Sequence, residues 1–172
     1  MFGMETVAAV QLALALIRTR PLAHWPEELC DWDDLARILA DTPLSGHGGT
    51  QADVEAVRAL RDWLVPALQP QSEQEASMAL NALVDDHDLK PRLIGRVVQH
   101  QGRDTQLATR LAGQIVPALM EAHVSGLIGR IGICQDAHCD TAFLDLSRKG
   151  GRQYCCPRCA TRSRVARYRK RV

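Results

Sequence analysis

The last 25 residues of the chain, 148–172, contain no aspartate or glutamate, although they hold ten lysines and arginines. The preceding residues 1–147 hold the other eleven basic residues and all twenty acidic ones, so their formal charge is 11 − 20 = −9, against +10 for the tail. The total of +1 therefore hides a strongly basic segment joined to an acidic one. Such a segment is expected to bind a polyanion.

Long apolar runs are also lacking. The run Val7–Ile17 is too short to cross a bilayer, and it follows Glu5 with no lysine or arginine before it. We therefore expect a buried helix here, with neither a membrane span nor a secretory signal. Aromatic residues make up only 4% of the chain, so Trp25, Trp32 and Trp63 are expected to anchor a core or an interface rather than to line a cofactor site.

Apolar residues recur at helical spacing through most of residues 1–128. Two of the expected helices begin with capping sequences, which pair Thr50 with Asp53 and Ser72 with Glu75. The fold class is therefore mainly α, with a helical N-terminal domain over residues 1–128. We predict helices over 4–20, 31–40, 50–68, 72–84 and 104–123, a small β-hairpin within 89–104, and a kink or interruption at Pro117.

Five of the six cysteines lie in the final 39 residues, and two close pairs form the pattern C-x4-C-x15-C-x3-C. Two pairs on either side of a connecting segment fit a tetrahedral thiolate site better than they fit disulfides. The sequence therefore predicts Zn²⁺ as cofactor and a reducing compartment. The predicted ligands are Cys134, Cys139, Cys155 and Cys159.

The ligand set has alternatives. Cys156 forms a C-x2-C pair with Cys159 and could replace Cys155, although Cys155 is favoured. His138 is a further alternative, but a neighbouring surface histidine is the simpler interpretation. The sixth cysteine, Cys30, is expected to be a small buried apolar residue.

The segment between the cysteine pairs, Phe143–Tyr154, has two short apolar runs around Lys149-Gly-Gly and predicts a β-hairpin. With the basic C-terminal helix that follows, it suggests a small treble-clef-like or ribbon-like zinc finger over residues 129–172. Arg148 and Arg152 are expected to offset the negative charge of the thiolates. No long linker precedes this module, so we expect it to pack against the helical domain.

The basic C-terminal helix has a narrow apolar stripe, formed by Val165, Tyr168 and Val172, which is the part that could be buried. One interpretation is a solvated helix whose charge balances the acidic domain. The favoured one is neutralisation of DNA phosphates. The predicted nucleic-acid contacts are Arg162, Arg164, Arg167, Arg169, Lys170 and Arg171.

These residues resemble the CGNR-type zinc-finger family, whose pattern joins a cysteine pair to F-x-D-x-S-R, R-x-aromatic-C and a last cysteine before a basic helix. The signature tetrad here is Cys159-Ala-Thr-Arg162, so its Gly and Asn are replaced. The matching positions are Cys134, Cys139, Phe143, Asp145, Ser147, Arg148, Arg152, Tyr154, Cys155, Cys159 and Arg162.

The resemblance implies Cys155 as ligand, because the family's cysteine follows the aromatic residue. It also implies that the protein is a bacterial cytoplasmic DNA-binding regulator. Residues 4–128 look like the helical domain that precedes the finger in this family, the domain of stress-induced transcription regulators. We expect that domain to form a homodimer or to sense a small-molecule effector. The alternative function is a zinc-stapled protein-interaction or thiol redox-sensing module without DNA binding. An enzyme is not expected, because a four-cysteine site leaves no open coordination position.

Overall fold

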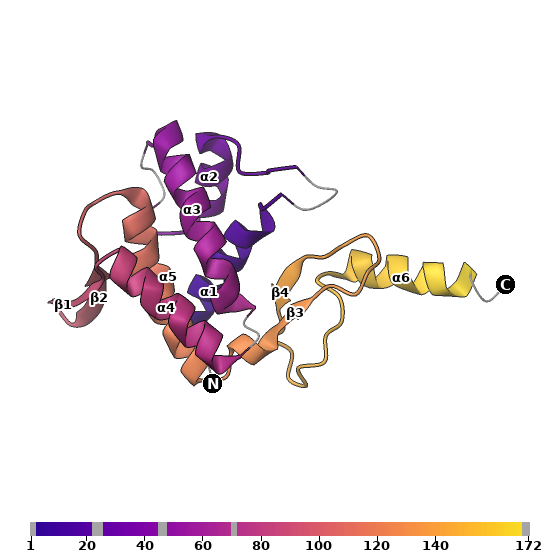
Figure 1. Ribbon diagram of the computed structural model, residues 1–172. Helices are drawn as coiled ribbons and strands as arrows, with labels where there is room; N and C mark the ends of the chain where they lie inside the picture. Colours follow the sequence, from indigo (N-terminus) through magenta and orange to yellow (C-terminus); the bar gives the residue numbers. More distant parts are fainter. Residues whose placement is uncertain (1–2, 22–25, 45–47, 70–71, 170–172) are drawn as a thin grey trace.

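A computed structural model of the protein describes residues 3–21, 26–44, 48–69 and 72–169. The predicted fold class is confirmed: the described part is mainly helical, with two small antiparallel hairpins (Figure 1). None of its helices is long and apolar enough to span a membrane. Its elements are α1 (Met4–Arg18), α2 (Trp32–Leu39), α3 (Gln51–Leu68), α4 (Glu73–Asp86), β1 (Lys90–Ile94), β2 (Val97–Gln101), α5 (Leu107–Val124), the 3-10 turn η1 (Ile128–Arg130), β3 (Ile131–Ile133), β4 (Ala142–Leu144) and α6 (Pro157–Arg169).

Helices α1 to α5 form the helical body, and α1 packs against α5 at its centre. Leu14 and Leu16 of α1 and Ile115 and Leu119 of α5 are almost completely buried. Helix α1 is apolar around most of its circumference, and it is therefore covered on several sides. Elements α2, α3, α5 and β4 all contact it. The predicted buried helix is thus confirmed.

The helix starts follow the predicted capping chemistry. Thr50 accepts a hydrogen bond from the backbone N–H of Asp53, whose carboxylate accepts one from the N–H of Thr50 in return. Asp31 and Asp34 form the same reciprocal pair at the start of α2. Ser72 accepts from the N–H of Glu75 at the start of α4. These side chains satisfy N–H groups that have no partner inside the helix.

Helix α5 differs from its prediction at two points. It begins at Leu107 rather than Asp104, because Asp104 accepts a hydrogen bond from the N–H of Gln106 and so forms a turn before the helix. It also continues through Pro117 as one helix, which excludes the interruption, while the alternative, a kink, stays a prediction. Its end at Ser125 and Gly126 is confirmed, with Gly126 at the positive φ that favours glycine.

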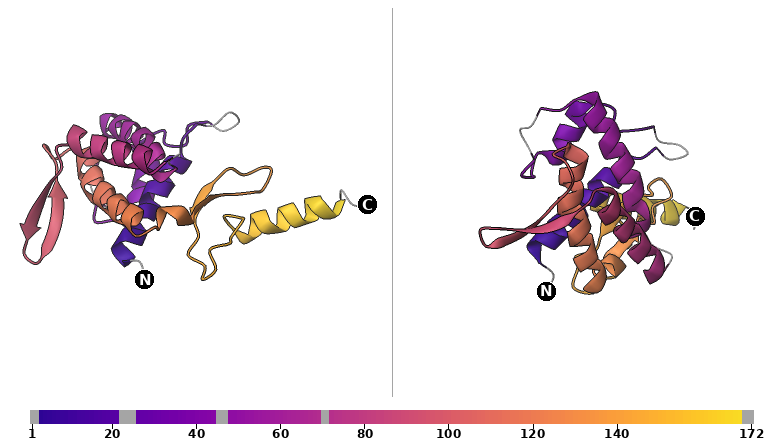
Figure 2. Two further views of the ribbon diagram at one scale, coloured as in Figure 1. Left: turned by 60° about the horizontal axis from the view of Figure 1, so that its bottom comes forward. Right: turned by 60° about the vertical axis from the view of Figure 1, so that its left-hand side comes forward.

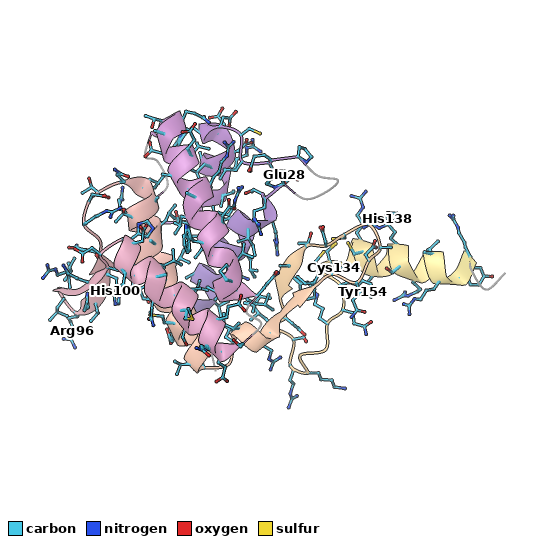
Figure 3. The ribbon with its side chains drawn as sticks, viewed as in Figure 1. Glu28, Arg96, His100, Cys134, His138 and Tyr154 are labelled. Carbon is cyan, nitrogen blue, oxygen red and sulfur yellow. The ribbon has the colours of Figure 1, made fainter. Side chains whose placement is uncertain are left out.

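The predicted hairpin in residues 89–104 is confirmed as the antiparallel pair β1–β2, with Gly95 at positive φ in its turn. It extends from the helical body with Arg96 at its tip (Figures 2 and 3). Its base lies against α5 at Gly113, where a side chain would meet the carbonyl oxygen of His100 at 2.3 Å. A glycine is therefore required at this helix–hairpin contact.

One expectation for the helical body was wrong. Cys30 is exposed, because it precedes the cap residue Asp31 in a loop. Trp63 is 59% exposed on α3, so of the two expected roles, core or interface, a place in the core is excluded and an interface stays a prediction. Trp32 does pack on the core as a half-buried residue. Trp25, His24 and His47 lie outside the described residues.

The C-terminal module, β3 to α6, is attached to the helical body through its hairpin. Ala142 and Leu144 of β4 are buried in the main core, and the Arg18 guanidinium of α1 donates a hydrogen bond to the carbonyl of Ala142 at 3.0 Å. The expected packing of module against body is confirmed. Beyond this attachment α6 points away from the helical body (Figures 1 and 2).

The hairpin of this module is not where the sequence placed it. Strand β4 pairs with β3, so the hairpin spans Ile131–Leu144 and encloses the first cysteine pair. The predicted return strand before Tyr154 is instead a loop. Asp145 causes this change, because its carboxylate accepts hydrogen bonds from the backbone N–H groups of Ser147 and Arg152, which a strand would need for pairing.

Candidate metal centre and basic helix

The structure brings the four predicted cysteines together. The sulfurs of Cys134, Cys139, Cys155 and Cys159 all lie within 4.8 Å of one another. The Cys155 sulfur is 3.7 Å from that of Cys139 and 3.7 Å from that of Cys159. A zinc ion with sulfurs at about 2.3 Å in a tetrahedron separates them by about 3.8 Å. The cluster therefore has the dimensions that Zn²⁺ requires.

Short local structures present these sulfurs. Cys134 directly follows β3, and Cys139 lies in the turn that leads to β4. Cys155 ends the loop after β4, while Cys159 is in the first turn of α6. Cys134 and Cys159 are buried, and Tyr154 packs beside them near the start of α6 (Figure 3). Hairpin, loop and helix therefore all meet at the sulfur cluster.

The alternative ligands lie close to this cluster but outside it. The Cys156 sulfur is 3.6 Å from that of Cys159, yet Cys156 is not one of the four mutually close sulfurs. Nor does the imidazole of His138 belong to that group. The backbone N–H of His138 instead donates a hydrogen bond to Asp136. The structure thus brings together the favoured set with Cys155.

The pKa values of the thiols indicate that the four adjacent sulfurs need a cation in order to be thiolates together. Burial opposes ionisation of Cys139, but hydrogen bonding to Thr141 and to neighbouring thiols outweighs it and lowers the pKa of Cys139 to about 7. Burial and the neighbouring thiols raise the pKa of Cys155, and they raise that of Cys159 to about 12. Without a cation, the four groups therefore cannot all be thiolates near neutral pH. A dication removes this obstacle by replacing the protons.

Arg162 has a partner inside the module. Its Nε donates to both carboxylate oxygens of Asp136, at 2.9 and 2.8 Å, and its Nη2 lies 3.7 Å from the Cys159 sulfur. The Asp136 side chain is 1% exposed, and the hydrogen bond from Arg162 lowers its pKa. This pair ties α6 to the first cysteine turn. The sequence predicted Arg162 as a DNA contact and gave no role to Asp136. The position of Asp136 between the predicted ligands Cys134 and Cys139 could have indicated that it supports the metal site.

The two arginines that were expected to offset the thiolate charge, Arg148 and Arg152, lie in different surroundings. Arg152 donates from Nε to the carbonyl of Tyr154 at 2.8 Å and from Nη2 to the carbonyl of Cys155, and its guanidinium lies 5.4 Å from the centre of the Phe143 ring. It therefore fixes the backbone that carries Cys155. Arg148 is exposed in the preceding turn. For both, direct compensation of the thiolate charge stays a prediction.

Helix α6 presents its other arginines to solvent. Arg164, Arg167 and Arg169 are exposed, and so are the apolar residues between them: Val165 is 44% exposed and Tyr168 70%. The stripe was the part of the helix that could be buried, and neither of these two residues is, because α6 projects away from the body. The predicted contacts Lys170 and Arg171, and the third stripe residue Val172, lie outside the described residues.

Comparison with known protein families identifies the module. Residues 130–172 match the CGNR zinc finger. The match confirms the resemblance drawn from the cysteine pattern, and it covers the whole sulfur cluster together with α6. The finger, as we call these residues from here on, combines a zinc-finger family match with four sulfurs at zinc-binding distances. No curated protein matches the chain. The place of residues 4–128 among stress-induced transcription regulators stays a prediction.

Proposed function

We propose that the protein is a zinc-dependent DNA-binding transcription regulator. In this proposal Cys134, Cys139, Cys155 and Cys159 hold Zn²⁺, and α6 binds the phosphate backbone. The observation that carries the proposal is the exposed basic helix, which projects from the acidic helical body and starts at the sulfur cluster. The helical body would then dimerise or respond to an effector.

Zinc would act as a structural ion here. It would close the fold by joining the β3–β4 hairpin, the loop and α6, and four sulfur ligands would leave no position for a substrate. A binding role is therefore favoured over catalysis. The Arg162–Asp136 pair supports this arrangement, since it holds α6 against the turn that carries the first cysteine pair.

DNA binding would rest mainly on arginines that have no partner among the described residues of the finger. Arg164, Arg167 and Arg169 are exposed, whereas Arg162 is 41% exposed and bound to Asp136. Each arginine that neutralises a phosphate contributes about 0.9 to the slope of log affinity against log salt. Arg162 would contribute less than the three others, because its guanidinium is already paired.

The test is binding of the zinc-loaded full chain to random-sequence duplex DNA over a range of salt concentrations, followed by fluorescence anisotropy. We expect strongly salt-dependent binding, and in the double variant Arg164→Ala/Arg167→Ala a slope reduced by about 1.8. The matched control is Arg92→Ala/Arg96→Ala, which removes the same charge from the exposed β1–β2 hairpin on the other side of the molecule. Absent or salt-insensitive binding, or an equal loss in the control, would contradict the proposal. Selection of bound sequences from random duplexes then tests specificity.

A second candidate function is thiol redox sensing, which the 3.6 Å distance between the Cys156 and Cys159 sulfurs favours. A peroxide would accept two electrons and two protons from this thiol pair, giving a disulfide and water or alcohol, and Cys159 would no longer bind zinc. The test is peroxide titration with zinc release as the readout. Release in the wild type but not in Cys156→Ser supports this function, and unchanged zinc content in the wild type contradicts it.

A further inference from the structure

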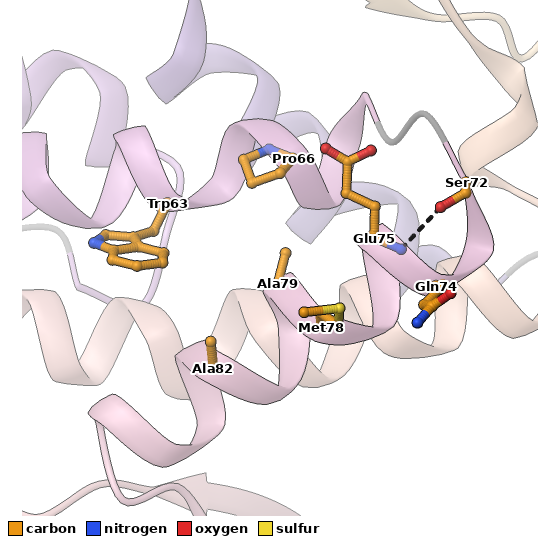
Figure 4. Close-up of a pocket in the computed structure, with 8 residues that line it drawn as sticks. All are labelled: Trp63, Pro66, Ser72, Gln74, Glu75, Met78, Ala79 and Ala82. Atoms are coloured by element: carbon orange, nitrogen blue, oxygen red, sulfur yellow. Dashed lines mark hydrogen bonds between the residues drawn. The ribbon is translucent and has the colours of Figure 1, made fainter.

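An open apolar groove lies on the helical body between α3 and α4. Its volume is about 410 Å³, and Trp63 and Pro66 of α3 face Met78, Ala79 and Ala82 of α4 across it (Figure 4). Trp63 is 59% exposed and Met78 66%. Two large apolar side chains that flank one groove and lie this open to solvent are typical of a binding surface.

The surroundings of the groove are acidic. Helix α4 carries Glu73, Glu75, Asp85 and Asp86, and it contains no lysine or arginine. The two arginines of α3, Arg58 and Arg61, both bind Glu27 and so add little free positive charge. The groove therefore suits a partner that is apolar on a narrow face and basic beside it.

Helix α6 has this combination. Val165 and Tyr168 of its apolar stripe lie on one face at the spacing i, i+3, with Thr161 one turn before Val165, and all three residues are exposed. Arg164 and Arg169 lie on either side of the stripe, and α6 contains no acidic residue. An acidic groove and DNA phosphates would therefore compete for these two arginines. An amphipathic helix of this kind can place its apolar stripe in a groove and its charges at the rim.

The dimensions and positions also agree. Helix α6 has 13 residues and α4 has 14, so each is about 20 Å long at 1.5 Å per residue. Because α6 points away from its own helical body, it is available to another copy (Figures 1 and 2). We propose that α6 of a second copy of this chain docks in the α3–α4 groove, so that two copies exchange their basic helices reciprocally.

The test is sedimentation velocity of the zinc-loaded full chain at several protein and salt concentrations. We expect a dimer that dissociates as salt rises, because the rim contacts are ionic and exposed. Met78→Lys puts a positive charge in the groove and should weaken the dimer about tenfold or more, which corresponds to about 1.4 kcal/mol. The control Ser77→Lys adds the same charge on α4 beside the groove and should weaken the dimer much less.

The helix side of the contact has its own matched pair. Val165→Glu places a charge in the stripe, whereas Ala166→Glu places it about 100° further around the same helix. The first should abolish the dimer and the second should largely keep it. Unchanged zinc content and helicity in all four variants show that the fold is kept.

Mixing two variants completes the test. Met78→Lys chains keep a working helix and Val165→Glu chains keep a working groove, so their mixture should associate through one intact contact, more strongly than either variant alone. A wild type that stays monomeric at every concentration overturns the proposal, and so does a Val165→Glu chain that dimerises like the wild type. A mixture no more associated than its separate components overturns it as well.

Discussion

The helical body buries an apolar core that joins α1, α3, α4 and α5, whereas the separate buried cluster of the finger consists of Cys134, Phe143 and Cys159. Ala142 and Leu144 join the finger to the core of the body, and the rest of the finger is held by polar contacts such as those of Asp136 with Arg162 and of Asp145 with the following loop. So small a cluster cannot offset the conformational entropy of the chain that it orders. The comparison indicates that the body folds on apolar burial and the finger on its metal.

Loss of one zinc ligand should have the largest effect, because it should unfold the finger and leave the helical body folded. In Cys139→Ser, or after chelation of zinc, we expect the finger to unfold, because a structural zinc site contributes about 10 kcal/mol or more. Amide hydrogen exchange should show lost protection in β3 and α6 and retained protection in α1 and α5. Equal loss in the body would show that the two regions fold as one unit.

A substitution in the apolar core of the body should destabilise the body and leave the metal site intact. Leu119 is completely buried in α5, so Leu119→Ala should lower the free energy of unfolding by about 4 kcal/mol through lost burial and the cavity left behind. Thermal or denaturant unfolding measures this change, and zinc stoichiometry of the folded protein should stay the same. A Leu119→Ala protein that loses zinc while its helices stay folded would contradict the conclusion that the body and the finger are stabilised separately.

A buried ion pair of the body gives a smaller effect. Arg61 is 2% exposed, and its Nη1 lies 2.7 Å from the carboxylate of Glu27. Glu27→Ala leaves this guanidinium without its main partner, so we expect a loss of about 3 kcal/mol in the free energy of unfolding. The control Glu28→Ala removes the same charge from the exposed neighbour and should change stability little.

The Glu27 contribution should also depend on pH. Burial opposes ionisation of Glu27, but its hydrogen bonds with Arg61 and the N–H of Leu29 outweigh this and lower its pKa below the ordinary 4.5. A lowered folded-state pKa means stabilisation that is complete above about pH 4.5 and is lost as pH falls through the lowered value. The stability difference between wild type and Glu27→Ala should therefore shrink in acid, and a pH-independent difference would contradict this assignment.

The smallest expected effect concerns the contact between α6 and the first cysteine turn. Asp136→Asn removes the charge that Arg162 binds, without removing a sulfur ligand. Groups that orient ligands typically change metal affinity by about 10- to 100-fold, and we expect the lower end because the backbone contacts remain. Competition with a chromogenic chelator measures it. An unchanged affinity would show that the pair does not support the metal site.

Local patterns made much of this structure predictable. Helix starts followed from capping residues such as Thr50 and Asp53, and the sulfur cluster followed from cysteine spacing. The finger's hairpin was misplaced because the side chain of Asp145 takes backbone N–H groups that the pattern of apolar residues assigns to a strand. Pairs distant in the sequence, such as Arg61 with Glu27, leave no periodic signal. The exposure of Trp63 depends on how α3 and α4 pack, which composition does not determine.

The most direct test of a finger organised by metal is X-ray absorption at the zinc edge on the full chain. We predict four sulfurs at about 2.3 Å and no nitrogen or oxygen ligand in the wild type and in Cys156→Ser. Cys155→Ser should lose one sulfur from this shell. A wild-type spectrum with a nitrogen or oxygen ligand, or loss of a sulfur in Cys156→Ser but not in Cys155→Ser, would contradict the account.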